Sequence, residues 1–391
     1  MAFNKGFDQY LIENFIHSES DTYKCIGKIS NQLLKIVTDA PNQDKKESHI
    51  HQFLDIFLKD YDLTISFSKK VILIYDEAIS VEILLALHTW FFTKTGNISN
   101  ITLVTTHTVG LNTWYDNYTK LMGEQGFNII EAPWFAYYLS YPNNLIVGCR
   151  TAAIISKKSF SKKLNYYFSY FGGRQSSLEK DFLATIAFES KIGYVDYLSG
   201  FDLNLQLFDD YLEQLSNFCN RSLIDKLLAI RNVNQKTQTY DIDPLFPDFF
   251  KTATVDKDWK IDKQAACRVI RETLNSTPFS IVTEKTLRSF VHSQIPLPLS
   301  GVGTIDQLTK LGFKFDHNLI DYDAYQFEPI FFKRVVKLYE QLTNLSICYT
   351  LPDLEEYMND NRELFCYNYE YIISGDVFKN IKENLIKELT K

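Results

Sequence analysis

The sequence lacks an excess of basic residues. Its 41 Lys and Arg stand against 48 Asp and Glu, which gives a formal net charge of −7 at pH 7. A protein that binds nucleic acid over most of its surface needs a positive field to neutralise the phosphates. The composition therefore disfavours nucleic-acid binding over the whole surface. A local basic groove is still compatible with this composition.

Cysteine is scarce and widely spaced. The six cysteines are Cys25, Cys149, Cys219, Cys267, Cys348 and Cys366, and no two of them form a CxxC pair. This spacing argues against a zinc ribbon and against a redox motif. We interpret these residues as reduced thiols in the core of a cytoplasmic protein.

Long hydrophobic runs are missing as well. The first residues have no basic patch followed by an apolar segment, and no later stretch offers about 18 uncharged apolar residues. We therefore expect neither secretion nor a membrane span. The chain has 391 residues, 45% hydrophobic and 23% charged, which predicts a globular protein with two domains.

Apolar strands alternate with helices in the first half of the chain. Short helices are predicted over residues 1–65. Beyond them, strands are predicted at 71–75, 101–105 and 127–130, and helices at 81–92 and 113–125. This alternation predicts an α/β fold with a parallel sheet covered on both faces. The region is Rossmann-like in outline, but it has no GxGxxG motif, so a dinucleotide cofactor is not predicted.

A second α/β block is predicted to begin near residue 164. Its strand at 166–171 is followed by the turn Gly172-Gly173-Arg174 and by a helix at 177–188. Free N–H groups at a helix N-terminus point toward an anion, and the guanidinium of Arg174 adds a fork of donors. The turn is therefore a candidate phosphate site, although Arg174 taken alone also fits an ordinary surface arginine.

The most informative segment begins two thirds of the way along the chain. It predicts a strand that ends near Glu272, a short loop, a helix that begins after Thr283, and a strand at 295–299. Thr283 fits the N-cap position, which places Glu284 and Lys285 in the first helical turn at the carboxyl edge of a parallel sheet. Open α/β sheets bind their ligands at that edge. There a carboxylate can accept hydrogen bonds from a ribose diol, and an ammonium group can pair with a diphosphate.

Further elements follow this segment in a fixed order. They are Ile295-Pro296-Leu297-Pro298-Leu299, Ser300-Gly301-Val302-Gly303, Leu308 to Leu311, Gly312-Phe313-Lys314-Phe315 and Asp321-Tyr322-Asp323-Ala324-Tyr325. Together with Glu272-Thr273 and Val282-Thr283-Glu284-Lys285, this order resembles the donor-binding half of α-1,3-fucosyltransferases. It is still more similar to related GT-B-type proteins of large viruses and phages. The match covers residues 269–325, and the helices predicted after it fit the closing helices of that family.

The resemblance implies two Rossmann-like domains that face each other across a cleft, as in GT-B enzymes. Residues 1–160 would form the acceptor-side domain, and residues 161–391 the nucleotide-sugar-binding domain with its closing helices. The implied activity moves a sugar from a nucleoside-diphosphate sugar to a hydroxyl of a glycan or of a modified DNA base. No metal or other cofactor is expected, because cationic side chains and helix dipoles can stabilise the leaving diphosphate.

The resemblance also assigns roles to particular residues. Glu284 would hold the ribose hydroxyls, Lys285 the diphosphate, and Glu272 would lie near the sugar or the loop. Thr283 would open the helix, and Arg174 would bind the phosphates. Simpler interpretations remain open at two of these places, where Glu272 also fits a surface ion pair with a neighbouring arginine and Glu284-Lys285 fits a solvated helix start.

Transfer to a hydroxyl requires a base on the acceptor side. Asp76 and Glu77 directly follow the strand at 71–75 and are our predicted catalytic residues. His107, after the next strand, is a further candidate. All three lie at the carboxyl ends of predicted parallel strands, the edge at which such sheets bind ligands.

Two departures from the family keep a second function open. No second arginine follows Arg174, and Tyr322 and Gln326 stand where the family more often has acids. These changes favour a non-catalytic GT-B-like binding or structural protein, for example in a virus particle or a host-interaction complex. The retained pair Glu284-Lys285 favours an enzyme.

Overall fold

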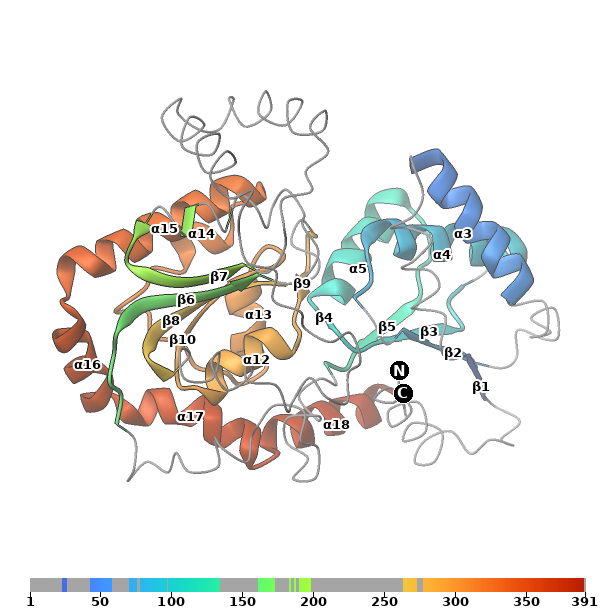
Figure 1. The fold of residues 1–391 in the computed structure, drawn as a ribbon. Helices are drawn as coiled ribbons and strands as arrows, with labels where there is room; N and C mark the ends of the chain where they lie inside the picture. The colour runs from blue at the N-terminus through green and yellow to red at the C-terminus, as the bar shows by residue number, and fades with distance from the viewer. Residues whose placement is uncertain are drawn as a thin grey trace, which may run out of the picture. The chain divides into compact units, whose positions relative to one another are not determined.

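A computed structural model gives the fold of the protein. It describes residues 23–26, 43–57, 70–75, 78–96, 98–133, 161–172, 183, 186–187, 190–197, 263–272 and 277–389. Within these residues the fold is mixed α/β, with two four-stranded parallel sheets and helices packed against them (Figure 1). The predicted parallel α/β character is confirmed.

The chain forms two compact units. The first unit consists of Met1–Tyr137, Thr277–Thr283 and Asp376–Lys391. The second consists of Tyr138–Ser276 and Glu284–Gly375. The chain thus returns twice to the first unit, whereas the sequence pattern places one boundary between residues 160 and 161.

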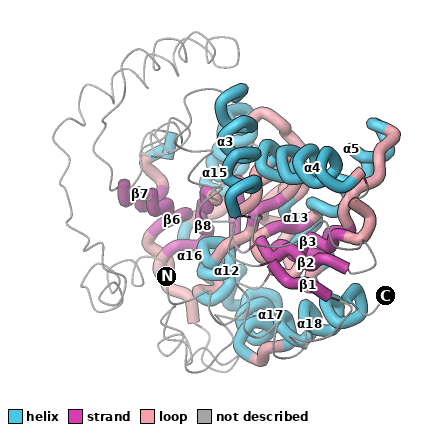
Figure 2. The backbone as a smooth tube through the Cα atoms, turned by 90° about the vertical axis from the view of Figure 1, so that its right-hand side faces the viewer, coloured by secondary structure: helices cyan, strands magenta, loops and turns pink. Residues whose placement is uncertain are grey.

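The first unit is built on a sheet of four parallel strands in the order β1-β2-β3-β5. The strands are β1 (Tyr23–Ile26), β2 (Lys70–Tyr75), β3 (Ile101–Thr105) and β5 (Asn128–Glu131). The helices of this unit are α3 (Gln43–Phe57), α4 (Val81–Thr95), α5 (Leu111–Met122) and α18 (Asp376–Leu389). β1, β2 and β3 lie side by side in Figure 2. Leu73 and Leu103 are opposite each other in the ladder and are fully buried, as a sheet covered on both faces requires.

Strand β1 corrects the prediction of short helices over residues 1–65, which holds for α3 but is wrong at β1. The four residues of β1 are too few to show a periodic pattern. Their extended conformation depends on pairing with β2, where Lys24 lies opposite Val71. A strand whose conformation depends on a distant partner cannot be predicted from the pattern of its neighbouring residues.

Helix boundaries in the first unit follow their capping residues. Ser80 precedes α4 and accepts a hydrogen bond from the N–H of Ile83 at 3.3 Å. α5 ends at Met122 because Gly123 adopts a left-handed conformation with φ of 70°. The predicted end of this helix at Gly126 is therefore too late by about one turn.

The second unit is built on the parallel sheet β10-β8-β6-β7. Its strands are β6 (Tyr166–Gly172), β7 (Gly193–Tyr197), β8 (Ala265–Arg271) and β10 (Ile295–Leu299). The helix α12 (Glu284–Val291) lies between β8 and β10 in the chain, as in a βαβ unit. Pro296 and Pro298 are tolerated within β10 because this strand forms the edge of the sheet, where missing N–H donors break no ladder.

Helices cover both faces of the second sheet. They include α13 (Thr304–Lys310), α14 (Asp323–Gln326), α15 (Phe331–Cys348), α16 (Leu351–Asp360) and α17 (Arg362–Ile373). Phe168 on β6 meets Tyr339 of α15 with ring centroids 5.6 Å apart, so this face of the sheet packs against α15. Ser169, whose side chain points to the opposite face, accepts a hydrogen bond from Gln294 just after α12.

Two smaller features complete the described fold. The short strands β4 (Thr108–Val109) and β9 (Ser280–Ile281) form an antiparallel pair within the first unit. None of the described helices is both long and apolar enough to span a membrane. Cys267 and Cys366 are buried and form no disulfide, as expected, but Cys348 is exposed, so the prediction of a core thiol is wrong there.

Candidate functional site

The carboxyl edge of the second sheet carries a buried acid. Glu272 directly follows β8, and its N–H still donates to the carbonyl of Leu299 on β10 at 3.2 Å. Its side chain is fully buried, and Oε1 accepts a hydrogen bond from Thr286 Oγ1 on α12 at 2.6 Å. Glu272 therefore ties the end of β8 to the first part of α12, and the alternative of a surface ion pair for this residue is wrong.

Lys285 lies next to this acid, in the first turn of α12. Its Nζ is 3.9 Å from Glu272 Oε2, and 42% of its side chain is exposed. The partner carboxylate is fully buried, so it cannot move far when a solute approaches. The ammonium group is thus held at the helix start by a fixed anion while a large part of the side chain stays accessible.

Two arginines add positive charge to the same side of the sheet. The guanidinium carbon of Arg268 lies 5.0 Å from the ring centre of Phe171 at the end of β6, and that of Arg288 lies 5.7 Å from it. Cations over an aromatic face are attracted by the ring quadrupole, which orients their planes. Arg268 lies on β8, and Glu272 lies four residues further on, directly after the strand.

The described charges of this edge favour an anion. Arg268, Lys285 and Arg288 bring positive charge close to the carboxylate of Glu272. The N-terminus of α12 lies at the same edge, and helix N-termini attract negative charge through their free N–H groups and the helix dipole. Within the part of the chain that the structure describes, no three His, Cys, Asp or Glu side chains are grouped as metal ligands.

The predicted donor-binding residues can be placed in part. Glu272 and Lys285 are brought together, and Thr283 is buried directly before the first residue of α12, as the predicted helix start requires. Residues that lie outside the described part of the chain are Asp76, Glu77 and Arg174, together with the side chain of Glu284. For these four, the assigned roles stay predictions.

The tetrapeptide Val282-Thr283-Glu284-Lys285 contains a crossing between the two units. Val282 and Thr283 belong to the first unit, and Glu284 and Lys285 belong to the second. In the first unit, the N–H of Val282 donates to the carbonyl of His107 at 3.0 Å. The further base candidate His107 is partly buried, and its Nδ1 lies 2.8 Å from Thr106 Oγ1.

Gln326, one of the two departures from the family pattern, has a structural role. It is buried, and its Oε1 accepts hydrogen bonds from the N–H groups of Ile305 and Asp306 at the start of α13. Its Nε2 donates to Asp306 Oδ1 at 3.1 Å and to Asp323 Oδ1 at 2.6 Å. A carboxylate at this position could accept the first pair of bonds but could not donate the second pair. The glutamine therefore matches its neighbours, independently of any change in activity.

Arg334 supports the same edge from α15 and was not among the predicted residues. Its side chain is buried and donates to the carbonyl oxygens of Ser300, Glu328 and Pro329. Burial lowers the pKa of this guanidinium to about 10, below its ordinary range. A sequence signal did exist, because position 334 lies on the apolar stripe of the helix beside Val335 and Leu338, where a charged residue needs a buried partner.

Comparisons with known proteins add little to this geometry. No family model matches the chain, and no curated protein sequence matches it. Among solved structures, a glycosyltransferase from Rickettsia africae ESF-5 aligns with 92% of this chain and 90% of its own chain, with a TM-score of 0.33 and 12% sequence identity. The interpretation of the site therefore depends on the residues of this chain.

Proposed function

We propose that the protein is a glycosyltransferase that takes its sugar from a nucleoside-diphosphate sugar and binds the diphosphate at the N-terminus of α12. The observation that carries the proposal is the pairing of Lys285 with the buried Glu272 at the carboxyl edge of the second sheet. Glu272 offsets the unfavourable position of this lysine against the helix dipole, and the exposed part of Lys285 can bind a further anion at the helix N-terminus. The ordered resemblance to fucosyltransferase-like proteins supports the same assignment.

Each of these residues has a separate role in the proposed reaction. When the bond between the anomeric carbon and the diphosphate breaks, negative charge grows on the leaving phosphate oxygen. Lys285 would stabilise that charge, with Arg174 as a second cation. Glu284 would accept hydrogen bonds from the ribose hydroxyls, and Asp76 or Glu77 would take the proton from the attacking acceptor hydroxyl.

Glu272 has a different part in this scheme. Its carboxylate is fully buried and is bound by Thr286 and Lys285, so it is a positioning residue that holds the lysine at the helix start. A fixed cation stabilises a transition state more than a mobile one, because no reorganisation is needed at the moment of reaction.

Nucleotide binding by the full chain tests the proposal. We expect calorimetry with GDP, UDP and their sugars to identify one nucleotide that binds. Lys285→Ala should weaken that binding at least tenfold, because a charge-assisted contact to phosphate is lost. Lys310→Ala is the matched control, since Lys310 is an exposed lysine in the last turn of α13 of the same unit. The control should bind like the wild type.

Two results would separate the alternatives. The proposal fails if folded wild-type protein binds none of these nucleotides, or if Lys285→Ala and Lys310→Ala bind equally well. Binding without transfer or hydrolysis of any sugar would instead favour the non-catalytic GT-B-like binding protein.

A further inference from the structure

Thr286 contacts the buried acid Glu272 from the first turn of α12. Its side chain is fully buried, and its hydroxyl donates to Glu272 Oε1 at 2.6 Å. Threonines inside helices commonly donate to the carbonyl four residues back, as Thr309 does to Ile305 at 2.9 Å. Thr286 is the third residue of α12, so the residue four positions back precedes the helix. The hydroxyl therefore points out of the helix, to an acid at the end of the neighbouring strand β8.

This hydrogen bond determines which oxygen of Glu272 lies toward Lys285. The last bond of a glutamate side chain rotates easily, and a donor on one oxygen fixes that rotation. Thr286 holds Oε1, and Oε2 lies 3.9 Å from Lys285 Nζ. That distance is longer than a hydrogen bond but short enough for an ion pair. Lys285 is thus attracted by the charge of Glu272 without donating a hydrogen bond to Oε2.

A phosphate group at the start of α12 competes with Glu272 for the same ammonium group. Charge-assisted hydrogen bonds to carboxylate and to phosphate are of similar strength, so a carboxylate that turns toward Lys285 displaces the phosphate. The N–H groups at the start of the helix attract the phosphate to the same place. A second donor that holds Glu272 in its present orientation therefore favours binding of the anion.

We propose that Thr286 is a positioning residue of the anion site and acts on Lys285 through Glu272. The proposal rests on the proposed function, in which Lys285 binds the diphosphate of a nucleotide sugar. The Thr286 hydroxyl keeps Glu272 turned so that Glu272 attracts Lys285 without taking a hydrogen bond that a phosphate oxygen can accept. Because the side chain of Thr286 has no exposed surface, it acts through Glu272 and not by contact with the nucleotide.

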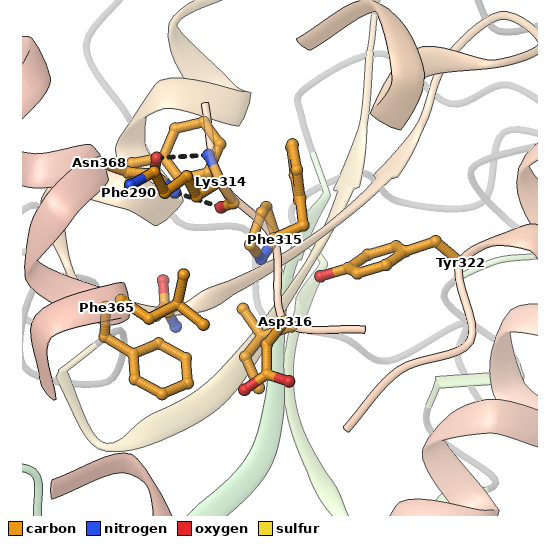
Figure 3. Close-up of a pocket in the computed structure, with 11 residues that line it drawn as sticks. Phe290, Lys314, Phe315, Asp316, Tyr322, Phe365 and Asn368 are labelled. Atoms are coloured by element: carbon orange, nitrogen blue, oxygen red, sulfur yellow. Dashed lines mark hydrogen bonds between the residues drawn. The ribbon is translucent and has the colours of Figure 1, made fainter. Parts of the chain in front are cut away.

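The other end of α12 is held independently of this hydrogen bond. Phe290 stacks on Phe313 with ring centroids 4.6 Å apart, and Gln294, just after the helix, donates to Ser169 at 3.3 Å. Phe290 also lines a small pocket beside Asp316, which has room for about one water molecule (Figure 3). Loss of the threonine hydroxyl leaves these contacts in place, so we expect its effect to be confined to the side chains at the N-terminal end of the helix.

Nucleotide binding by the full chain tests the proposal. Thr286→Val keeps the branched shape but removes the hydroxyl, so it should weaken binding of GDP or UDP, whichever the wild type binds, by about threefold to tenfold. Thr286→Ser keeps the hydroxyl and should restore most of the affinity. Ser289→Ala is the matched control, because Ser289 is buried on the same helix and its hydroxyl donates to the carbonyl of Thr286. The control should bind like the wild type.

A double-mutant cycle separates positioning from a purely structural role. If Thr286 acts through Lys285, Thr286→Val should change the affinity by less than about twofold when Lys285 is already alanine. A residue that only stabilises the fold would weaken binding by the same factor in both backgrounds. If Lys285→Ala binds too weakly to be measured, the comparison of Thr286→Val with Thr286→Ser and Ser289→Ala decides.

Three results would overturn the proposal. The first is equal binding by the wild type and Thr286→Val. The second is an equal loss of affinity in Thr286→Val and Ser289→Ala. The third is an equal effect of Thr286→Val in the presence and absence of Lys285.

Inorganic pyrophosphate, as a second probe, distinguishes failure of this proposal from failure of the proposed function. If the wild type binds pyrophosphate but neither nucleotide, the proposed function fails, and the same variants measured with pyrophosphate decide the role of Thr286. If the wild type binds a nucleotide and Thr286→Val has no effect, only the role of Thr286 is rejected. If the wild type binds none of the three probes, both proposals fail.

Discussion

A buried carboxylate lies near each end of α12, and the two differ in how many of their oxygens have partners. At its N-terminal end, both oxygens of Glu272 have partners, in Thr286 and Lys285. At its C-terminal end, Asp316 has partners at one oxygen only, among the residues that the structure describes. A buried carboxylate whose two oxygens both have partners holds other residues in place, whereas a buried oxygen without a partner lowers the stability of the folded state.

The largest effect is expected at Arg334, a second buried charge whose side chain has several hydrogen-bond partners. Arg334→Met should lower the free energy of unfolding by about 3 kcal/mol, because the buried carbonyl oxygen of Ser300 and the partly buried carbonyl oxygens of Glu328 and Pro329 lose their donor. Urea unfolding followed by circular dichroism measures it. Arg362→Met is the control, since Arg362 is exposed at the start of α17, and it should stay within about 0.5 kcal/mol of the wild type. A similar loss in both variants would contradict the role given to Arg334.

The next effect compares the two carboxylates directly. Glu272→Ala should cost about 2 kcal/mol, because Thr286 loses its acceptor and a cavity remains. Glu272→Gln should cost less, since it keeps an oxygen for Thr286. Asp316→Asn should cost about 0 kcal/mol or stabilise the protein, because it removes a buried carboxylate oxygen that has no partner among the described residues. Equal losses in Glu272→Ala and Asp316→Asn, measured by the same urea unfolding, would contradict this difference between the two carboxylates.

The smallest effect comes from an ion pair at the surface of the same unit. The hydrogen bond from Lys337, at 2.9 Å, holds the pKa of Glu328 below its usual range. Because the pKa is lower in the folded state, the stabilisation is present above the unfolded pKa and is lost as the pH falls through the folded pKa. We expect a loss of up to about 1 kcal/mol in acid, since the lysine is 43% exposed.

Melting temperatures between pH 7 and pH 3 check this prediction. Glu328→Gln cannot ionise, so the part of the pH dependence that comes from this pair should disappear in the variant. An unchanged difference between neutral and acid pH in Glu328→Gln would show that other carboxylates carry the effect.

Much of the fold could be predicted from local patterns. The strands at 101–105 and 295–299 agree with β3 and β10 at both ends, because each is a short apolar run bounded by polar or turn residues. The end of α5 was misplaced because two glycines, Gly123 and Gly126, are close together and only the former adopts the left-handed conformation at the helix end. β1 could not be found, since its strand conformation depends on a partner more than forty residues away.

The candidate site could be predicted only in part. Glu272 and Lys285 were recognisable because they lie near the ends of predicted elements, and the edge of a parallel sheet brings such ends together. Phe171 was not recognisable as the ring beneath Arg268 and Arg288, because the two arginines come from different elements. No pattern in the sequence indicated the pocket at Asp316, because the residues that line it come from three separate parts of the chain.

The sequence by itself determined the alternation of strands and helices, the beginning of α12 after Thr283, and the acid and lysine at its edge. These depend on neighbours within one or two turns of the chain. Only the tertiary structure decided which buried charges have partners. Glu272 meets Thr286 across 14 residues and Arg334 meets Ser300 across 34 residues, so their pairing depends on how the elements pack. Whether Asp316 keeps an open oxygen depends on the same packing.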